Sequence, residues 1–442
     1  MSTPDADLAG DATSSAAPQN PYASKKACYY ALGLLTIVYA FNFIDRQLLA
    51  ILQESIKADL ELSDSQLGLL TGFAFAIFYV TAGLPIARWA DRGNRRNIVS
   101  LSLFIWSFMT AISGFVQNYY QLLLARIGVG VGEAGGSPPS HSIISDIFPA
   151  NQRASAIGFY SAGISVGILF GFLAGGWLNE FFGWRTAFMV VGVPGVILAL
   201  VLRFTLAEPL RGLHDAAGSQ DSAKASFGDV LHILRSRPSF KHLAIGAGLN
   251  AFCGYATANW TASFMIRTHA MPVGELGTYL AFTIGLGGAF GVFGGGLLAD
   301  YLSARDKRWY AWLPSLCGFI IVPFMTAVYL VDTAYAALAM SIVPSLLFQV
   351  YLGNTIATTH ALVSPTMRAT ASAILFLILN IIGLGGGPWV IGVVSDYLSP
   401  SLGSESLRYA MLYVLPPVMA WSAFHYWLAS RSLRDDIANA PS

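Results

Sequence analysis

Residues 125–136 read ARIGVGVGEAGG, a glycine-rich run that carries two charges, Arg126 and Glu133, inside an otherwise apolar segment. A charged side chain at membrane depth costs about 3 kcal/mol or more, so it persists where it is paired, hydrated or used. Because Glu133 follows Arg126 by about two helical turns, both side chains lie on one helix face. We expect that face to line an aqueous cavity in a membrane protein.

The composition supports a membrane-embedded chain. Of its 442 residues, 55% are hydrophobic and only 11% are charged, whereas a soluble protein carries about 25% charge. The net charge of +1 gives no overall bias towards nucleic acid. The cysteines Cys28, Cys253 and Cys317 lack the spacing of a metal site, and no nucleotide loop or nucleophile–base pair is visible. We expect neither enzymatic activity nor a cofactor.

Apolar runs long enough to span a bilayer recur about twelve times along the chain. The expected spans are 28–52, 66–90, 97–116, 120–146, 153–181, 184–206, 240–268, 275–301, 309–331, 334–362, 368–396 and 406–430. The chain is therefore predicted to be an all-α membrane protein.

The loops after spans 2 and 8 are rich in Lys and Arg, whereas the loop at 53–65 is mostly acidic. By the positive-inside rule, both termini are expected to lie on the cytoplasmic side. The protein itself is expected in the cell membrane.

Landmarks of the first half recur in the second. Span 2 ends in ARWAD at 87–91 and span 8 in GLLAD at 296–300, while RTAF at 185–188 opens span 6 and RYAM at 408–411 opens span 12. This repetition predicts two pseudo-symmetric six-helix bundles with a substrate site between them near the midplane. The expected bundles are 28–206 and 240–430. A disordered tail at 1–27, a cytoplasmic linker at 207–239 and a tail at 431–442 complete the chain. The linker should contain a short amphipathic helix, since Phe227, Val230, Leu231 and Leu234 share one helix face.

The run DRGNRR at 91–96 is similar to the signature of the major facilitator superfamily, Gly-x-x-x-Asp-Arg-x-Gly-Arg-Arg. The chain departs from it at Ala87 and Asn94, where the signature has glycine. Within that superfamily, NFIDR at 42–46 and RIGVGVGEA at 126–134 resemble the Spinster-like lipid transporters. The resemblance implies the major facilitator fold. It also implies proton-driven movement of lysophospholipid or sphingosine-phosphate amphiphiles.

The charged residues of spans 1 and 4 are the main functional candidates. Asp45 lies roughly 12 Å from the outer end of span 1 and Arg126 roughly 9 Å from that of span 4, so they could pair. Glu133 is the first candidate for proton carrier and Asp45 the second. The alternative is a permanent bridge, Arg126–Glu133 or Asp45–Arg126, that locks the helices. Arg46 and Arg126 are candidates to bind a headgroup oxyanion, or simply to balance charge.

Two further sets of residues complete the candidate site. The expected cavity-lining residues are Asn42, Tyr255, Asn259, Tyr351 and Thr355, although such polar side chains also bond neighbouring helices. The expected cytoplasmic gate comprises Asp91, Arg88, Arg92, Arg95, Arg96, Asp146 and Asp300. Its arginines could equally serve only to orient the chain in the membrane.

Together these features predict a monomeric secondary transporter that uses a proton gradient to move an anionic or zwitterionic lipid-like amphiphile. The competing interpretations are a transporter of a small organic anion or drug, and a membrane receptor or scaffold that does not transport.

Overall fold

The computed structural model describes residues 20–212 and 226–440, and within these ranges every regular element is a helix. The helices before the linker are α1 Lys25–Leu60, α2 Asp64–Thr71, α3 Phe73–Arg92, α4 Arg95–Ser113, α5 Tyr119–Glu133, α6 Ser137–Ile147 and α7 Ala150–Thr205. The linker contributes α8 Phe227–Ser236. The remaining helices are α9 Pro238–His269, α10 Val273–Leu280, η1 Ala281–Leu286, α11 Gly287–Ser303, α12 Trp309–Leu330, α13 Ala334–Leu347, α14 Val350–Ala361, η2 Pro365–Met367, α15 Arg368–Ile378, η3 Leu379–Gly386, α16 Gly387–Leu402, η4 Gly403–Glu405 and α17 Ser406–Ala438.

These helices group into passes across a membrane. In α7 the chain turns at Gly183, whose φ of 80° suits glycine, so this helix makes two passes. The pairs α2–α3, α5–α6, α10–α11, α13–α14 and α15–α16 each form one interrupted pass. Over the described ranges this grouping gives six passes in each half, consistent with the expected fold. The expected tail at 1–27 lies mostly outside the described residues, as do 213–225 of the linker and the last two residues.

Local sequence explains where several helices begin. Ser24, Asn94 and Asn118 each accept a backbone N–H of the following turn and so cap α1, α4 and α5. Ser63 and Gln66 form a reciprocal capping box at the start of α2. These short polar residues fix the connections at the ends of the apolar runs.

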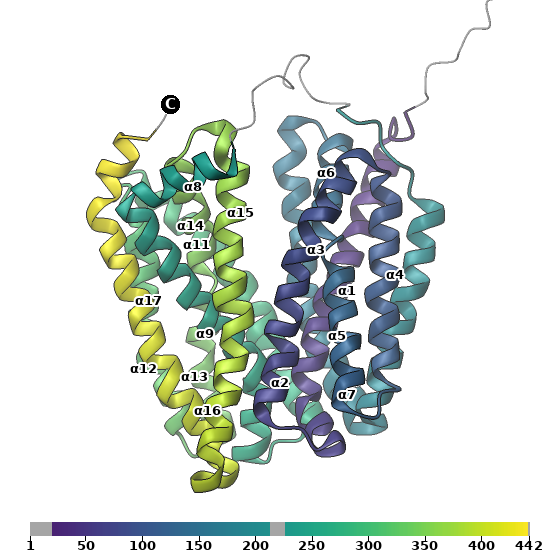
Figure 1. Ribbon diagram of the computed structural model, residues 1–442, viewed down its shortest axis with the longest axis vertical. Coiled ribbons are helices and arrows are strands. Elements are labelled where there is room, and N and C mark those ends of the chain that lie inside the picture. The colour runs from purple at the N-terminus through teal and green to yellow at the C-terminus, as the bar shows by residue number, and fades with distance from the viewer. Residues whose placement is uncertain (1–19, 213–225, 441–442) are drawn as a thin grey trace, which may run out of the picture.

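The two halves meet at one end of the molecule and separate at the other. Figure 1 shows them apart at the end where the described chain begins and finishes, called here the terminal end, and converging at the opposite end. At the opposite end α2 packs against α16 and α7 against α10. A Cβ at Gly68 would lie 2.5 Å from the carbonyl oxygen of Pro388, so this glycine allows close approach of α2 and α16.

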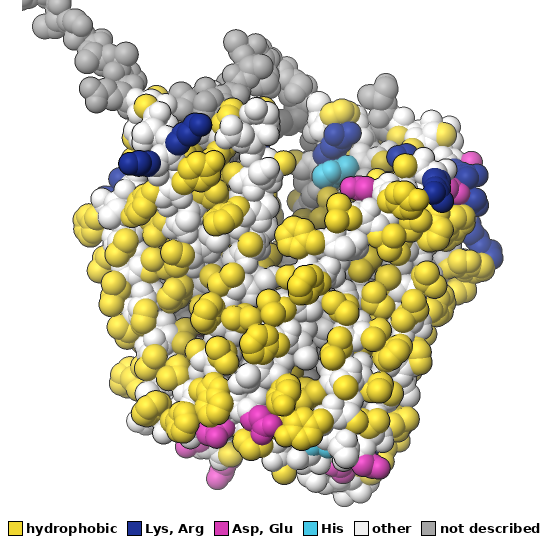
Figure 2. All heavy atoms as spheres, turned by 180° about the vertical axis from the view of Figure 1, so that it is seen from behind, with side chains coloured by type: hydrophobic (Ala, Val, Ile, Leu, Met, Phe, Trp, Pro, Cys, Tyr) yellow, Lys and Arg dark blue, Asp and Glu magenta, His cyan; other side chains and the backbone are white. Residues whose placement is uncertain are grey.

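The surface has the layout of a membrane protein. Figure 2 shows hydrophobic side chains covering the middle of the visible face. Lys and Arg lie near the terminal end, whereas Asp and Glu lie near both ends. It also shows the molecule hollowed between the halves at the terminal end. The hollow gives access to the interface between the halves from that end.

The linker helix α8 rests on the second half. Val230 and Leu234 are fully buried against Leu362 and Ile374, while Phe227 on the same helix is 54% exposed. Part of the apolar face of α8 therefore packs against the protein itself, and the exposed Phe227 remains available to contact a membrane surface.

Candidate functional site

Two buried ion pairs connect α1 to α5 in the first half. In the first, Arg126 Nη1 donates to Asp45 Oδ2 over 3.0 Å, and both residues are almost completely buried. The hydroxyl of Thr110 on α4 donates to the other oxygen of Asp45 over 2.5 Å. The pair expected from the similar depth of Asp45 and Arg126 is therefore present. The hydrogen bond from Thr110 also connects it to helix α4.

In the second pair, Glu133 Oε2 accepts a hydrogen bond from Arg46 Nε over 2.8 Å and lies 2.7 Å from Arg46 Nη2 in an ion pair. Glu133 is the last residue of α5, and the turn at 134–136 separates it from α6. Glycines and prolines around this turn explain the interruption, because they weaken a continuous helix. Interrupted helices are a recurrent setting for substrate and ion sites in transporters.

The Arg126–Glu133 bridge considered from the sequence is not formed; Glu133 pairs with Arg46 instead. Glu133 Oε1 and Arg126 Nε are both buried without a hydrogen-bond partner. The side chain of Arg46 is 16% exposed, whereas those of Glu133, Asp45 and Arg126 are at most 4% exposed. Arg46 is therefore the member of this cluster that solvent or a ligand reaches first.

The expected cavity-lining residues divide between several settings. Tyr255 is half-buried and packs against hydrophobic clusters of both halves, and the half-buried Asn259 donates to the Tyr255 carbonyl over 2.9 Å. Asn42 is buried inside the first half beside Trp106.

Tyr351 and Thr355 lie inside the second half. Tyr351 is buried in a hydrophobic cluster, and the fully buried Thr355 hydroxyl lies 2.7 Å from that of Tyr426. Thr355 therefore forms a hydrogen bond between helices α14 and α17 and, being fully buried, does not line a cavity. This is the alternative role considered for such polar side chains in a membrane protein.

At the terminal end, the buried Arg95 forms ion pairs with Asp146 and with Glu208, the latter at 2.8 Å. Glu208 also accepts from the backbone N–H of Arg96 over 2.8 Å. All of these residues belong to the first half and to the beginning of the linker. Glu208 was not predicted, because it lies beyond the last apolar residue of span 6 and has no motif of its own.

The remaining expected gate residues are Arg88, Asp91, Arg92 and Asp300. They make no ion pair within the ranges that the structure describes. This agrees with halves that are apart at this end. Their role as a gate stays a prediction about a state in which this end is closed.

The opposite end contains a charge cluster that connects the halves. Arg267 on α9 donates to both oxygens of Glu54 and to both oxygens of Asp64, with all four distances between 2.7 and 2.8 Å. Asp396 on α16 accepts the backbone N–H groups of Asp64 and Ser65 over 2.9 and 2.8 Å. Bidentate arginine–carboxylate contacts are among the strongest side-chain hydrogen bonds. We call Glu54, Asp64, Arg267 and Asp396 the closure cluster.

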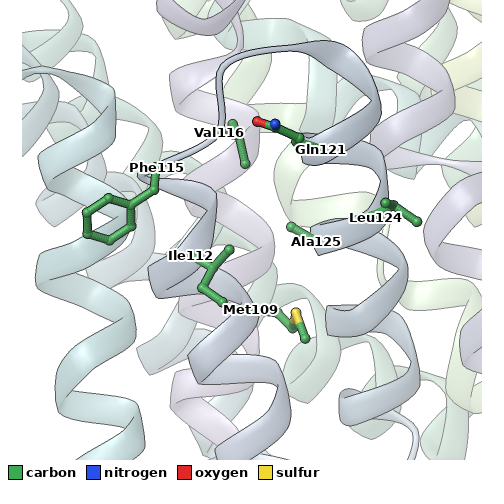
Figure 3. Close-up of a pocket in the computed structure, with 7 residues that line it drawn as sticks. All are labelled: Met109, Ile112, Phe115, Val116, Gln121, Leu124 and Ala125. Atoms are coloured by element: carbon green, nitrogen blue, oxygen red, sulfur yellow. The ribbon is translucent and has the colours of Figure 1, made fainter.

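A separate crevice lies between α4 and α5 and has a volume of about 310 Å³. Figure 3 shows its lining residues, Met109, Ile112, Phe115, Val116, Gln121, Leu124 and Ala125. Phe115 and Leu124 are both 68% exposed, so the crevice opens on the bilayer-facing surface. None of the four charged residues of the ion pairs lines it, and we assign it no role in transport.

The Asp45–Arg126 pair supplies a test of stability. Asp45→Asn leaves a buried guanidinium without its counter-charge, so we expect it to destabilise the protein by about 3–5 kcal/mol. The double variant Asp45→Asn, Arg126→Met removes both charges and should be more stable than the single variant. Thermal unfolding in detergent measures the difference. Asp59→Asn is the control, since the Asp59–Arg185 pair is about 40% exposed and is expected to contribute at most about 1 kcal/mol. Equal losses from Asp45→Asn and Asp59→Asn would contradict the expectation.

Comparisons with known proteins agree with this geometry. The family model described as Major Facilitator Superfamily matches residues 35–432. An "MFS-type efflux pump" from Mycolicibacterium smegmatis is 33% identical over 99% of each chain, and "Protein spinster homolog 1" of Xenopus tropicalis is 30% identical over 86% of this chain and 76% of its own. A crystal structure of a bacterial homologue of the human lysosomal transporter Spinster, inward-facing and unoccupied, superposes with a TM-score of 0.83 at 35% identity, covering 93% of this chain and 99% of that one. The chain therefore belongs to the major facilitator superfamily, as a membrane-spanning transporter similar to the Spinster proteins.

Proposed function

We propose that this transporter is coupled to protons and moves a lipid-like amphiphile, of the lysophospholipid or sphingosine-phosphate type, by alternating access. The observation that carries the proposal is the buried pair Arg46–Glu133 at the break between α5 and α6. An intramembrane carboxylate paired with one partly accessible arginine can exchange a proton or a ligand.

The orientation of the chain defines the state of the transporter. The terminal end carries Lys and Arg on the face seen in Figure 2, and the positive-inside rule makes that end cytoplasmic. The hollow between the halves then opens to the cytoplasm, and the closure cluster seals the outside. Alternating access follows if the two halves rock about their contact region and exchange which end is closed.

Proton coupling is supported by opposing effects on Glu133. Complete burial and an unpartnered Oε1 favour the neutral carboxyl group, whereas the two contacts from Arg46 favour the ionised form. A movement of Arg46 away from Glu133 removes the second effect and leaves the first. A conformational change that separates Arg46 from Glu133, with no other cation in its place, would thus drive uptake of a proton.

The surroundings of Arg46 support the proposed substrate class. Its guanidinium is a planar fork suited to phosphate or carboxylate oxygens. One hydrophobic cluster near Arg46 joins Phe75 of the first half to Leu384 of the second. A hydrocarbon tail can lie along such apolar side chains while the headgroup reaches Arg46. An amphiphile with one tail fits these two requirements together.

Flux into proteoliposomes tests the proposal. Lysophospholipids, sphingoid phosphates and small organic anions are compared with and without an imposed pH gradient. Accumulation of the amphiphiles that requires the gradient is the expected result. Gradient-driven transport of soluble organic anions or drugs alone would favour the second candidate function, to which the similarity to an efflux pump points. Absence of flux for every compound would favour a receptor or scaffold.

A further inference from the structure

Three aromatic rings surround the guanidinium group of Arg46. Its Cζ lies 5.1 Å from the ring centroid of Phe43, 4.9 Å from that of Phe75 and 5.3 Å from that of Tyr79. Phe43 belongs to α1, whereas Phe75 and Tyr79 lie one turn apart on α3. We call these three rings the aromatic box.

The aromatic box is held in place by its own contacts. The rings of Phe75 and Tyr79 stack at 5.6 Å, and Tyr39 packs edge-on against Phe43 at 5.3 Å. Phe75 is only 2% exposed. Since the ring positions rest on ring–ring and core contacts, the box persists when Arg46 moves. Several ring faces around one cation are the arrangement by which proteins recognise quaternary ammonium groups.

The charges beside the box favour a ligand that carries both signs. The ionic cluster consists of two carboxylates and two guanidinium groups in two ion pairs, Asp45 with Arg126 and Glu133 with Arg46. A ligand with a single charge that separates Arg46 from Glu133 leaves a buried charge without a partner, which is costly. A zwitterionic headgroup supplies one group for each partner, and the buried, unpartnered Glu133 Oε1 is available beside it.

We propose that Phe43, Phe75 and Tyr79 form a subsite for the ammonium group of a zwitterionic headgroup. The anionic group of the ligand binds Arg46, the one partly exposed member of the cluster, and draws its guanidinium out of the aromatic box. The ammonium group then takes its place between the rings and next to Glu133. This inference rests on the proposed function, because it assigns the headgroup of the same amphiphile.

Equilibrium binding in detergent tests the subsite separately from transport. Lysophosphatidylcholine and lysophosphatidylglycerol with the same acyl chain compete against a fluorescent lysolipid on the purified full-length protein. We expect the natural protein to prefer the choline headgroup by about tenfold, the size of a desolvated cation–π contribution. Phe43→Leu and Tyr79→Leu should reduce that preference to about twofold or less, while Tyr79→Phe keeps the ring and the preference.

The matched control is Phe108→Leu. Phe108 stacks on Phe104 at 5.7 Å on the exposed face of α4, away from the cluster, so its loss should leave the headgroup preference unchanged. Equal weakening of both lysolipids in Phe43→Leu and Tyr79→Leu would overturn the subsite. If proton-driven flux is observed but the ring variants do not change the headgroup preference, the subsite is excluded and the proposed function is retained. If the choline preference depends on the three rings but no proton-driven flux is observed, the subsite is supported and the proposed function is excluded.

Discussion

Replacing Glu133 by glutamine is expected to reduce pH-gradient-driven accumulation of the amphiphile to the level of liposomes without protein. Glutamine has the same size and can still accept from Arg46, but it cannot gain or lose a proton at membrane depth. Exchange of substrate between two pools, which needs no net proton movement, should continue. Uptake and counterflow in proteoliposomes measure the two activities side by side.

The control for this variant is Glu61→Gln, which changes an exposed carboxylate at the end of α1 in the same way. It should leave both activities unchanged. A Glu133→Gln protein that still concentrates substrate when a pH gradient is imposed would exclude Glu133 as the proton carrier. Asp45 would then be the remaining candidate of the cluster.

Arg267→Gln is expected to open the end of the molecule that is closed in this structure. The arginine is the cation of the closure cluster, and its loss leaves Glu54 and Asp64, which face it, as like charges with one fewer partner. Truncating one member of a buried ion pair costs about 3–5 kcal/mol, and about 1.4 kcal/mol already changes a population ratio tenfold. The lower end of that range corresponds to a change of about a hundredfold in the ratio of the two states.

Distance measurements between spin labels detect the shift. Labels at Glu61 and Ser401 lie at this end in opposite halves, and the three native cysteines are replaced beforehand. We expect a longer distance to become dominant in Arg267→Gln. The control is Arg185→Gln, since Arg185 pairs with Asp59 at the same end but within one half. An unchanged distance distribution in Arg267→Gln would mean that apolar packing of the helices, not the closure cluster, holds this end shut.

The sequence was sufficient for the all-helical, membrane-spanning fold class and for one ion pair. Apolar runs of membrane-spanning length predict helices directly, and α9 over Pro238–His269 closely matches the expected span at 240–268. The Asp45–Arg126 pair followed from the similar depth of the two residues, together with the superfamily resemblance, which implies that spans 1 and 4 both line the cavity. Physical constraints of the bilayer make such depth arguments reliable.

The partner of Glu133 could not be deduced in this way. Arg46 and Arg126 are both within reach by depth, and the choice depends on which way α1 is rotated against α5. Adjacent residues on α1 point to different partners, Asp45 to Arg126 and Arg46 to Glu133. Helix rotation is set by packing, which apolar periodicity in a membrane helix barely constrains.

The closure cluster and the aromatic box were missed for a related reason. Both are assembled from residues far apart in the chain, such as Arg267 with Glu54, and Phe43 with Tyr79. Each residue alone is unremarkable, an interfacial charge or one of many aromatic side chains. Their meaning appears only when two helices bring them together.

The composition of the four-residue ionic cluster has a consequence for membrane voltage. With Glu133 ionised, the charges of Asp45, Arg46, Arg126 and Glu133 cancel, so in the proposed mechanism this cluster adds no electrical work to the return of the empty carrier. With a proton on Glu133 the same group carries one positive charge, and moving it through the full field is coupled to about 2.3 kcal/mol per 100 mV. Under the proposed proton coupling, the membrane potential therefore acts on the step in which the cluster is protonated, whereas the return step moves no net charge of this cluster.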